Sequence, residues 1–132
     1  MYRTNENEMQ MFAGKLILFF GESTLLTKKT ESSLKNAGII PLGPVGTVEE
    51  ALSAVESVNI DAVILDVALD ATLIFPVIAR LDEKAVPFIF AAPPTREYKN
   101  PAGFVLSDRN RDLVRIGHVL FPPPPNTSAS IH

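Results

Sequence analysis

The segment DAVILDVALD, residues 61–70, places a carboxylate at the end of an apolar run. Asp66 follows four aliphatic residues, and a second acid, Asp70, comes four positions later. A short, continuous apolar run predicts a strand that is covered on both faces. A single acid at the end of such a strand is either a functional group or a cap for the loop that follows. We expect Asp70 to be the N-cap of the next helix.

Four more apolar runs alternate with segments of helical periodicity, which predicts strands joined by helices. We expect a capping box between Thr47 and Glu50 at the start of one helix, and a left-handed cap at Gly38 that closes another. Pro76 is expected in the first turn of a third helix. The predicted strands are 15–20, 38–42, 61–65, 87–91 and 103–106, and the predicted helices are 24–37, 47–58, 74–83 and 110–120.

This alternation predicts an α/β fold with an open parallel sheet, right-handed crossovers and helices on both faces. The segment PPTREYKNP, 93–101, has three prolines and no apolar periodicity, so we expect a loop in place of a helix there. In such sheets functional groups gather at the carboxyl ends of the strands. The residues expected at that edge are Gly21, Glu22, Asp66, Ala91, Ala92, Ser107 and Asp108.

The composition argues against several classes of protein. The chain has 132 residues, of which 46% are hydrophobic, a net charge of −3, a sequence pI near 5.3 and no cysteine. One domain over 14–121 is expected, with flexible segments at 1–13 and 122–132. The acidic balance argues against a nucleic-acid partner, and no apolar run is long enough to span a membrane. We expect a cytoplasmic protein.

Over roughly residues 15–120 the sequence resembles the receiver domain of bacterial two-component response regulators. The similarity is strongest to atypical single-domain receivers, in the segment LDVALDATLIFPVIARLDEKAVPFIFA. In those receivers the fourth strand continues Phe-Ala-Thr-Gly, whereas this chain has Phe90, Ala91, Ala92 and Pro93. The resemblance implies a flavodoxin-like, doubly wound sheet of five strands, with the fourth helix reduced or replaced by the Pro-rich loop.

The resemblance also assigns roles to the residues at the carboxyl edge. Asp66 lies at the position of the phosphoacceptor, which takes a phosphoryl group from a histidine kinase. The Mg²⁺-binding acid pair falls on Gly21 and Glu22, so that one carboxylate remains. The phosphate-binding Thr or Ser position holds Ala92. The Lys-Pro pair falls on Ser107 and Asp108.

A transferred phosphoryl group carries negative charge that requires cations and hydrogen-bond donors around it. With three of the five family positions changed, only a weak Mg²⁺ site is expected, formed by Glu22 and Asp66. Arg96, Lys99 or Arg109 would have to replace the missing lysine. Phe104 is the candidate for the aromatic switch residue of the family, but Ala92 lacks the hydroxyl that would couple it to the phosphate.

We therefore predict a stand-alone receiver-like protein of a phosphorelay system, with little or no phosphorylation at Asp66. It would act by contact with a histidine kinase or another signalling protein. One alternative is a functional phosphoacceptor, a phosphate sink or relay that uses Asp66 and Glu22 with Mg²⁺. Another is a pseudo-receiver that binds a small molecule. An enzyme is not expected, because no cofactor motif or nucleophile–base pair is present. The sequence leaves open whether the chain forms a weak homodimer.

Overall fold

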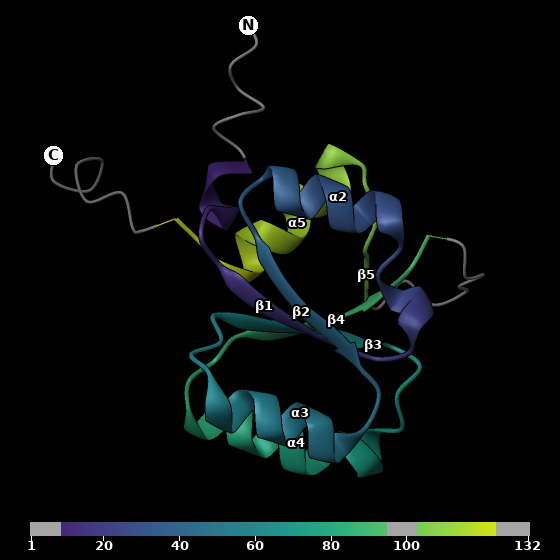
Figure 1. Ribbon diagram of the computed structural model, residues 1–132, viewed down its shortest axis with the longest axis vertical. Helices are drawn as coiled ribbons and strands as arrows, with labels where there is room; N and C mark the ends of the chain where they lie inside the picture. The colour runs from purple at the N-terminus through teal and green to yellow at the C-terminus, as the bar shows by residue number, and fades with distance from the viewer. Residues whose placement is uncertain (1–8, 95–102, 124–132) are drawn as a thin grey trace, which may run out of the picture.

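The computed structural model describes residues 9–94 and 103–123, and the predicted loop at 93–101 falls mostly outside these ranges. Five parallel strands form one sheet in the order β2-β1-β3-β4-β5 (Figure 1). This order confirms the flavodoxin-like arrangement predicted from the sequence. The strands are β1 (Leu16–Phe20), β2 (Ile40–Val45), β3 (Ala62–Asp66), β4 (Phe88–Ala92) and β5 (Phe104–Val105), and the helices are η1 (Gln10–Phe12), η2 (Ser23–Leu25), α2 (Lys28–Asn36), α3 (Val48–Ser57), α4 (Ala71–Glu83) and α5 (Asn110–Leu120).

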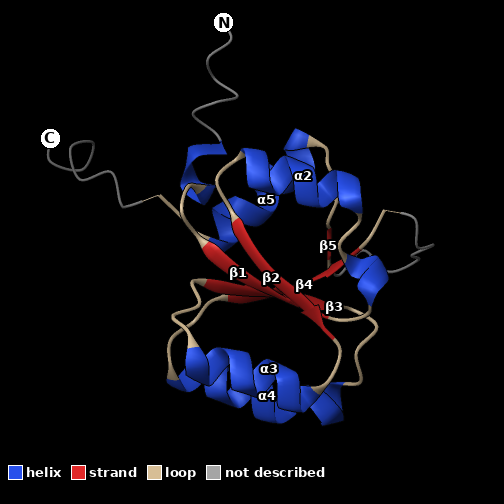
Figure 2. Cartoon of the chain, in the orientation of Figure 1, coloured by secondary structure: helices blue, strands red, loops and turns tan. Residues whose placement is uncertain are grey.

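Helices cover both faces of the sheet, as Figure 2 shows, with α2 and α5 on one side and α3 and α4 on the other. Each side has its own apolar cluster, and β1 contributes alternate residues to the two. Ile17 and Phe19 point toward α2 and α5, whereas Leu18 and Phe20 point toward α3 and α4. Every residue of β3 is buried, which explains why its sequence is continuously apolar.

Two of the predicted caps form as expected. The Thr47 hydroxyl accepts a hydrogen bond from the Glu50 backbone N–H, and the Glu50 carboxylate accepts one from the Thr47 N–H. The Asp70 carboxylate accepts hydrogen bonds from the backbone and hydroxyl of Thr72, and these bonds hold the pKa of Asp70 below its usual value. Because Asp70 caps the helix, α4 begins at Ala71. The predicted start at residue 74 was wrong, and Pro76 lies beyond the first turn.

The predicted helix over 24–37 is in fact two elements. A short 3-10 turn, η2, is followed by α2, which starts after Thr27. The Thr27 hydroxyl accepts a hydrogen bond from the Thr30 N–H at 3.2 Å, so it provides the N-cap. Gly38 has φ of +99°, which confirms the left-handed cap expected there.

The folded part of the chain starts earlier than residue 14, the domain boundary that we expected. The helix η1 packs on α5, and Phe12 is fully buried in the cluster beneath it. The Phe12 ring meets that of Phe121 edge-on, with 6.2 Å between centroids. Added at Gly117, a Cβ would lie 2.7 Å from the Met11 side chain. Residues 1–8 and 124–132 lie outside the described ranges.

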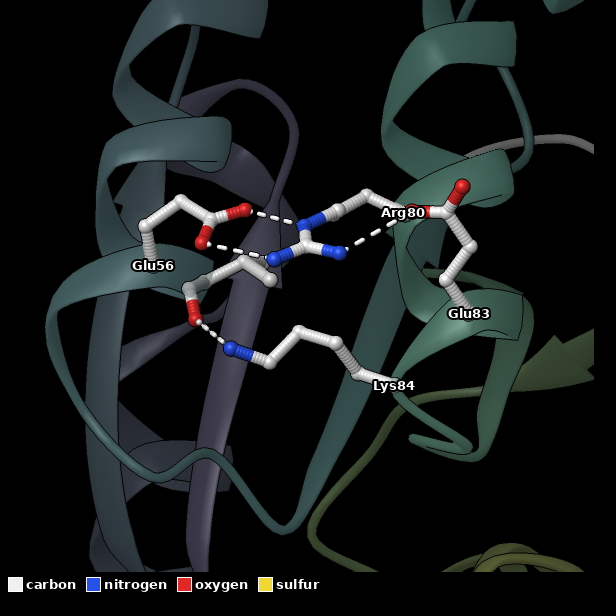
Figure 3. Close-up of polar contacts among 5 residues, drawn as sticks. Glu56, Arg80, Glu83 and Lys84 are labelled. Carbon is white, nitrogen blue, oxygen red and sulfur yellow. Dashed lines mark hydrogen bonds and ion pairs between the residues drawn. The ribbon is translucent and has the colours of Figure 1, made fainter.

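One ion pair and one hydrogen bond join α3 to the C-terminal end of α4 (Figure 3). The Arg80 guanidinium binds both carboxylate oxygens of Glu56 and also pairs with Glu83, at 2.9 Å. The Lys84 ammonium donates to the Val55 carbonyl oxygen at 3.0 Å. Arg80 lowers the pKa of Glu56, and the two glutamates raise the pKa of Arg80. These contacts fix the two helices side by side at the surface.

Candidate functional site at the carboxyl edge of the sheet

Asp66 ends β3 at the carboxyl edge, but its side chain is turned into the protein. Only 2% of the residue is exposed. Its Oδ1 accepts a hydrogen bond from the Ala68 backbone N–H at 2.9 Å, so that Asp66 caps the turn that follows the strand. The next peptide is tied to β4, because the Val67 N–H donates to the Ala91 carbonyl oxygen at 3.0 Å. The carboxylate thus has a structural role whatever its chemistry.

Gly21, at the end of β1, leaves the space that the Asp66 side chain occupies. If Gly21 carried a Cβ, that atom would lie 2.6 Å from Asp66 Cβ and 3.2 Å from Asp66 Oδ2. Such a distance is far below van der Waals contact, so an acid does not fit at Gly21 unless Asp66 or a strand moves. The absence of a side chain at Gly21 and the inward position of Asp66 are therefore two aspects of one packing arrangement.

Glu22 does not join Asp66 in a formed metal site. It is exposed and precedes η2, and its backbone carbonyl accepts a hydrogen bond from the Leu25 N–H. In residues 9–94 and 103–123 no group of three or more acidic or histidine side chains could hold a metal ion. Mg²⁺ prefers near-octahedral oxygen ligands, and Asp66 and Glu22 would supply only part of that set, one from a buried and one from an exposed residue. The weak site expected from the sequence stays a prediction.

The two remaining family positions are buried and lack the expected groups. Ala92 is 1% exposed, and its carbonyl oxygen accepts a hydrogen bond from the Leu106 N–H. Ser107 is 2% exposed. Its hydroxyl donates to Asp112 Oδ2 at 2.7 Å and accepts from the Arg109 N–H at 3.0 Å. Ser107 therefore secures the start of α5, in place of the family's lysine.

The Ser107–Asp112 hydrogen bond was not predicted from the sequence. A serine five residues before an acid at a helix start was the available signal, but many exposed pairs share that spacing. Asp108, next to Ser107, is exposed.

Phe104 is half-buried and packs on the α2–α5 side, where the Arg115 guanidinium lies 5.4 Å from its ring centroid. This cation–π contact stabilises the observed position of the candidate switch aromatic.

A hollow of about 290 Å³ opens at the ends of β4 and β5. Ala92 and Ser107, two of the positions singled out in the sequence, are among its lining residues. Apolar and charged side chains line it together: Ala92, Pro93, Pro94, Val105, Ser107, Arg109 and Asp112. Of the three cations considered for the missing lysine, Arg109 is the one within the described residues. Arg96 and Lys99 lie outside them.

Comparison with solved structures gives the same fold. The response regulator PhyR from Brucella abortus has a TM-score of 0.62 and 22% identity, over 99% of this chain and 58% of that chain. A second structure, of the PhyR stress response regulator, has a TM-score of 0.61 and 21% identity, over 95% and 52%. The lysine decarboxylase LdcF from Francisella novicida has a TM-score of 0.52 and 22% identity, over 83% and 17%.

No protein-family model and no curated protein sequence matches the chain significantly. The chain spans little more than half the length of the PhyR chains. Among the described residues, no helix has the length and apolar character needed to cross a bilayer. At these levels of identity the likeness concerns the fold. The chain thus has the flavodoxin-like fold of the response regulator PhyR, as its resemblance to receiver domains predicted.

Proposed function

We propose that this chain is a receiver-like signalling protein that works by contact with other proteins, a histidine kinase or another regulator, with little or no phosphorylation at Asp66. The observation that carries the proposal is the packing of Asp66 against Gly21. Asp66 as a residue is 2% exposed, and its carboxylate accepts a hydrogen bond from the Ala68 N–H, whereas phosphoryl transfer would need an accessible oxygen. A Cβ at Gly21 would clash with it at 2.6 Å.

The surroundings of Asp66 also lack the groups that would stabilise an acyl phosphate. Ala92 offers no hydroxyl, and the Ser107 hydroxyl is already bound to Asp112. Phosphoryl transfer depends on cations and donors that are in place before the reaction. Without a contact that differs between two states, phosphate would not shift the position of Phe104. The activity of the chain would then be controlled by the binding of a partner protein and not by phosphorylation.

Intact-mass measurement after incubation with a small acyl-phosphate donor and Mg²⁺ tests the proposal. We expect no 80 Da adduct under conditions that fully modify a functional receiver, run in parallel as the positive control. An adduct that disappears in Asp66→Asn would overturn the proposal and favour the functional phosphoacceptor that uses Asp66 and Glu22. An adduct that persists in Asp66→Asn would show modification elsewhere and leave Asp66 unphosphorylated.

A second candidate function is small-molecule binding, which the hollow between β4 and β5 favours. Its volume of about 290 Å³ is close to the lower end of small-molecule sites. Arg109 and Asp112 give it one cation and one carboxylate, so a small zwitterion or polar metabolite would fit its chemistry. Ligand-detected NMR with a metabolite library tests this function. Binding that Val105→Phe abolishes would support it, and no binder in the library would count against it.

A further inference from the structure

An apolar groove runs along the edge of the sheet, between β2 and the outer flank of α3. Its volume is about 530 Å³. Leu42 and Val45 form its strand side, while Ala54 and Val58 form its helix side. The two serines of this flank, Ser53 and Ser57, are short, so the groove stays open along the helix.

Exposed apolar residues lie beside the groove lining on the same face of the sheet. In the sheet, Ile40 pairs with Leu16 and Leu42 with Leu18, so both β2 side chains lie on the α3 side. Ile40 is 54% exposed and Val58 is 41% exposed, which makes them two of the most exposed large apolar residues described. Contiguous apolar surface of this kind marks a binding site more often than isolated exposed residues do.

The rim of the groove carries charge of one sign. Glu49 and Glu50 line it, and among residues 9–94 and 103–123 no lysine or arginine does. Both glutamates are exposed, and neither forms an ion pair within the described residues. An occupant with positive charge beside an apolar stripe would complement this rim.

The strand edge itself does not favour an added β-strand. The Ile40 N–H donates inward to the Lys15 carbonyl oxygen, so the backbone nitrogen of the next residue faces the open edge. That residue is Pro41, which has no N–H to donate, and Pro44 lacks one further along the same strand. Side chains in the groove, and not the backbone of the edge, would therefore hold a partner.

A second copy of the chain is also disfavoured. In a two-fold contact, the same surface of both copies would meet, and the Glu49 and Glu50 side chains of each would approach those of the other. Like charges brought together at an interface oppose association. We propose that this groove binds a helical segment of another protein, in which an apolar stripe is flanked by lysine or arginine. This inference is independent of the phosphorylation of Asp66.

Peptide binding to the ¹⁵N-labelled full chain tests the groove directly. The probes are a 16-residue amphipathic helix of leucine, alanine and lysine, and a matched peptide with glutamate in place of lysine. We expect amide shifts confined to residues 40–58 with the lysine peptide, weakened by added salt, and none with the glutamate peptide. Shifts centred on another surface, or equal binding of both peptides, would overturn the proposal.

Two variants separate the shape of the groove from its charge. Ala54→Gln fills the helix side without adding charge, and Glu49→Lys reverses the rim charge while leaving the Thr47–Glu50 capping box intact. Each should weaken the lysine peptide about tenfold or more. Val119→Gln, on α5 and 52% exposed, is the matched control and should have no effect. Unchanged affinity in both groove variants, with unchanged thermal unfolding, would overturn the proposal. So would self-association through residues 40–58.

Discussion

The interior of the sheet and its carboxyl edge differ in how much of the receiver pattern they keep. In the interior, β1 and β3 retain the continuous apolar sequence that two covered faces require. At the edge, the acid, hydroxyl and lysine positions hold Gly21, Ala92 and Ser107. Glycine and alanine cannot serve the family's chemistry, and the serine is committed to Asp112. This difference shows that packing and chemistry are separate requirements, because a fold does not fix the chemistry of its site.

Residues at the carboxyl edge nevertheless make structural contacts. Asp66 caps its own turn and fills the space above Gly21, and Ser107 secures the start of α5. To bind a phosphoryl group, Asp66 and Ser107 would first have to break these structural contacts.

The largest effect is expected in the interior, from Phe12→Ala. Phe12 is fully buried and packs edge-on against Phe121, so its truncation leaves a cavity. We expect the free energy of unfolding to fall by about 3–5 kcal/mol, measured by urea denaturation. Phe75→Ala is the matched control, because Phe75 is 66% exposed, and it should change stability by no more than about 0.5 kcal/mol. Equal losses would show that residues 9–13 are not part of the core.

At the edge, Gly21→Ala should cost about 1–3 kcal/mol, since its Cβ would lie 2.6 Å from Asp66 Cβ. Gly46→Ala is the control. A Cβ at Gly46 meets nothing within 4 Å, so this change should be neutral or slightly stabilising. Urea denaturation of both variants measures the difference. If Gly21→Ala were as mild as Gly46→Ala, the edge would have room for an acid after all, and a metal site could be rebuilt there.

The structural role of Asp66 predicts a difference between two of its substitutions. Asp66→Ala removes the acceptor for the Ala68 N–H and should cost about 1–2 kcal/mol. Asp66→Asn keeps an oxygen in the same place and should cost less. Thermal unfolding of the two variants gives the comparison. Equal stability of both variants and the wild type would mean that the carboxylate is retained for chemistry and not for the turn.

The smallest effect is expected at the surface, where Arg80 joins α3 to α4. Because Arg80 lowers the pKa of Glu56 in the folded state, the pair stabilises the fold above the pKa of the unfolded glutamate, about 4.3. This contribution is lost as the pH falls through the lowered pKa. Urea midpoints of wild type and Glu56→Gln should differ at pH 7 and converge toward pH 3. A difference that does not depend on pH would contradict the role of the ion pair.

Short-range patterns in the sequence predicted most of the fold. The capping box at Thr47, the Asp70 cap and the left-handed Gly38 each depend on residues within four positions of one another. The predictions were wrong where contacts between residues far apart in the sequence determine the structure. Met9–Phe12 lies among polar residues and reads as part of a tail, yet Phe12 enters the core, because η1 packs against a helix about a hundred residues away.

The sequence by itself determined the order of strands and helices and the open parallel sheet, because apolar periodicity and helix caps are local. It also placed Asp66 at the end of a buried strand. Only the tertiary structure decided that Asp66 turns inward over Gly21, that Ser107 binds Asp112, and that β2 and α3 leave a groove with an acidic rim. Those features depend on how closely separate strands and helices approach one another, and no local pattern encodes that distance.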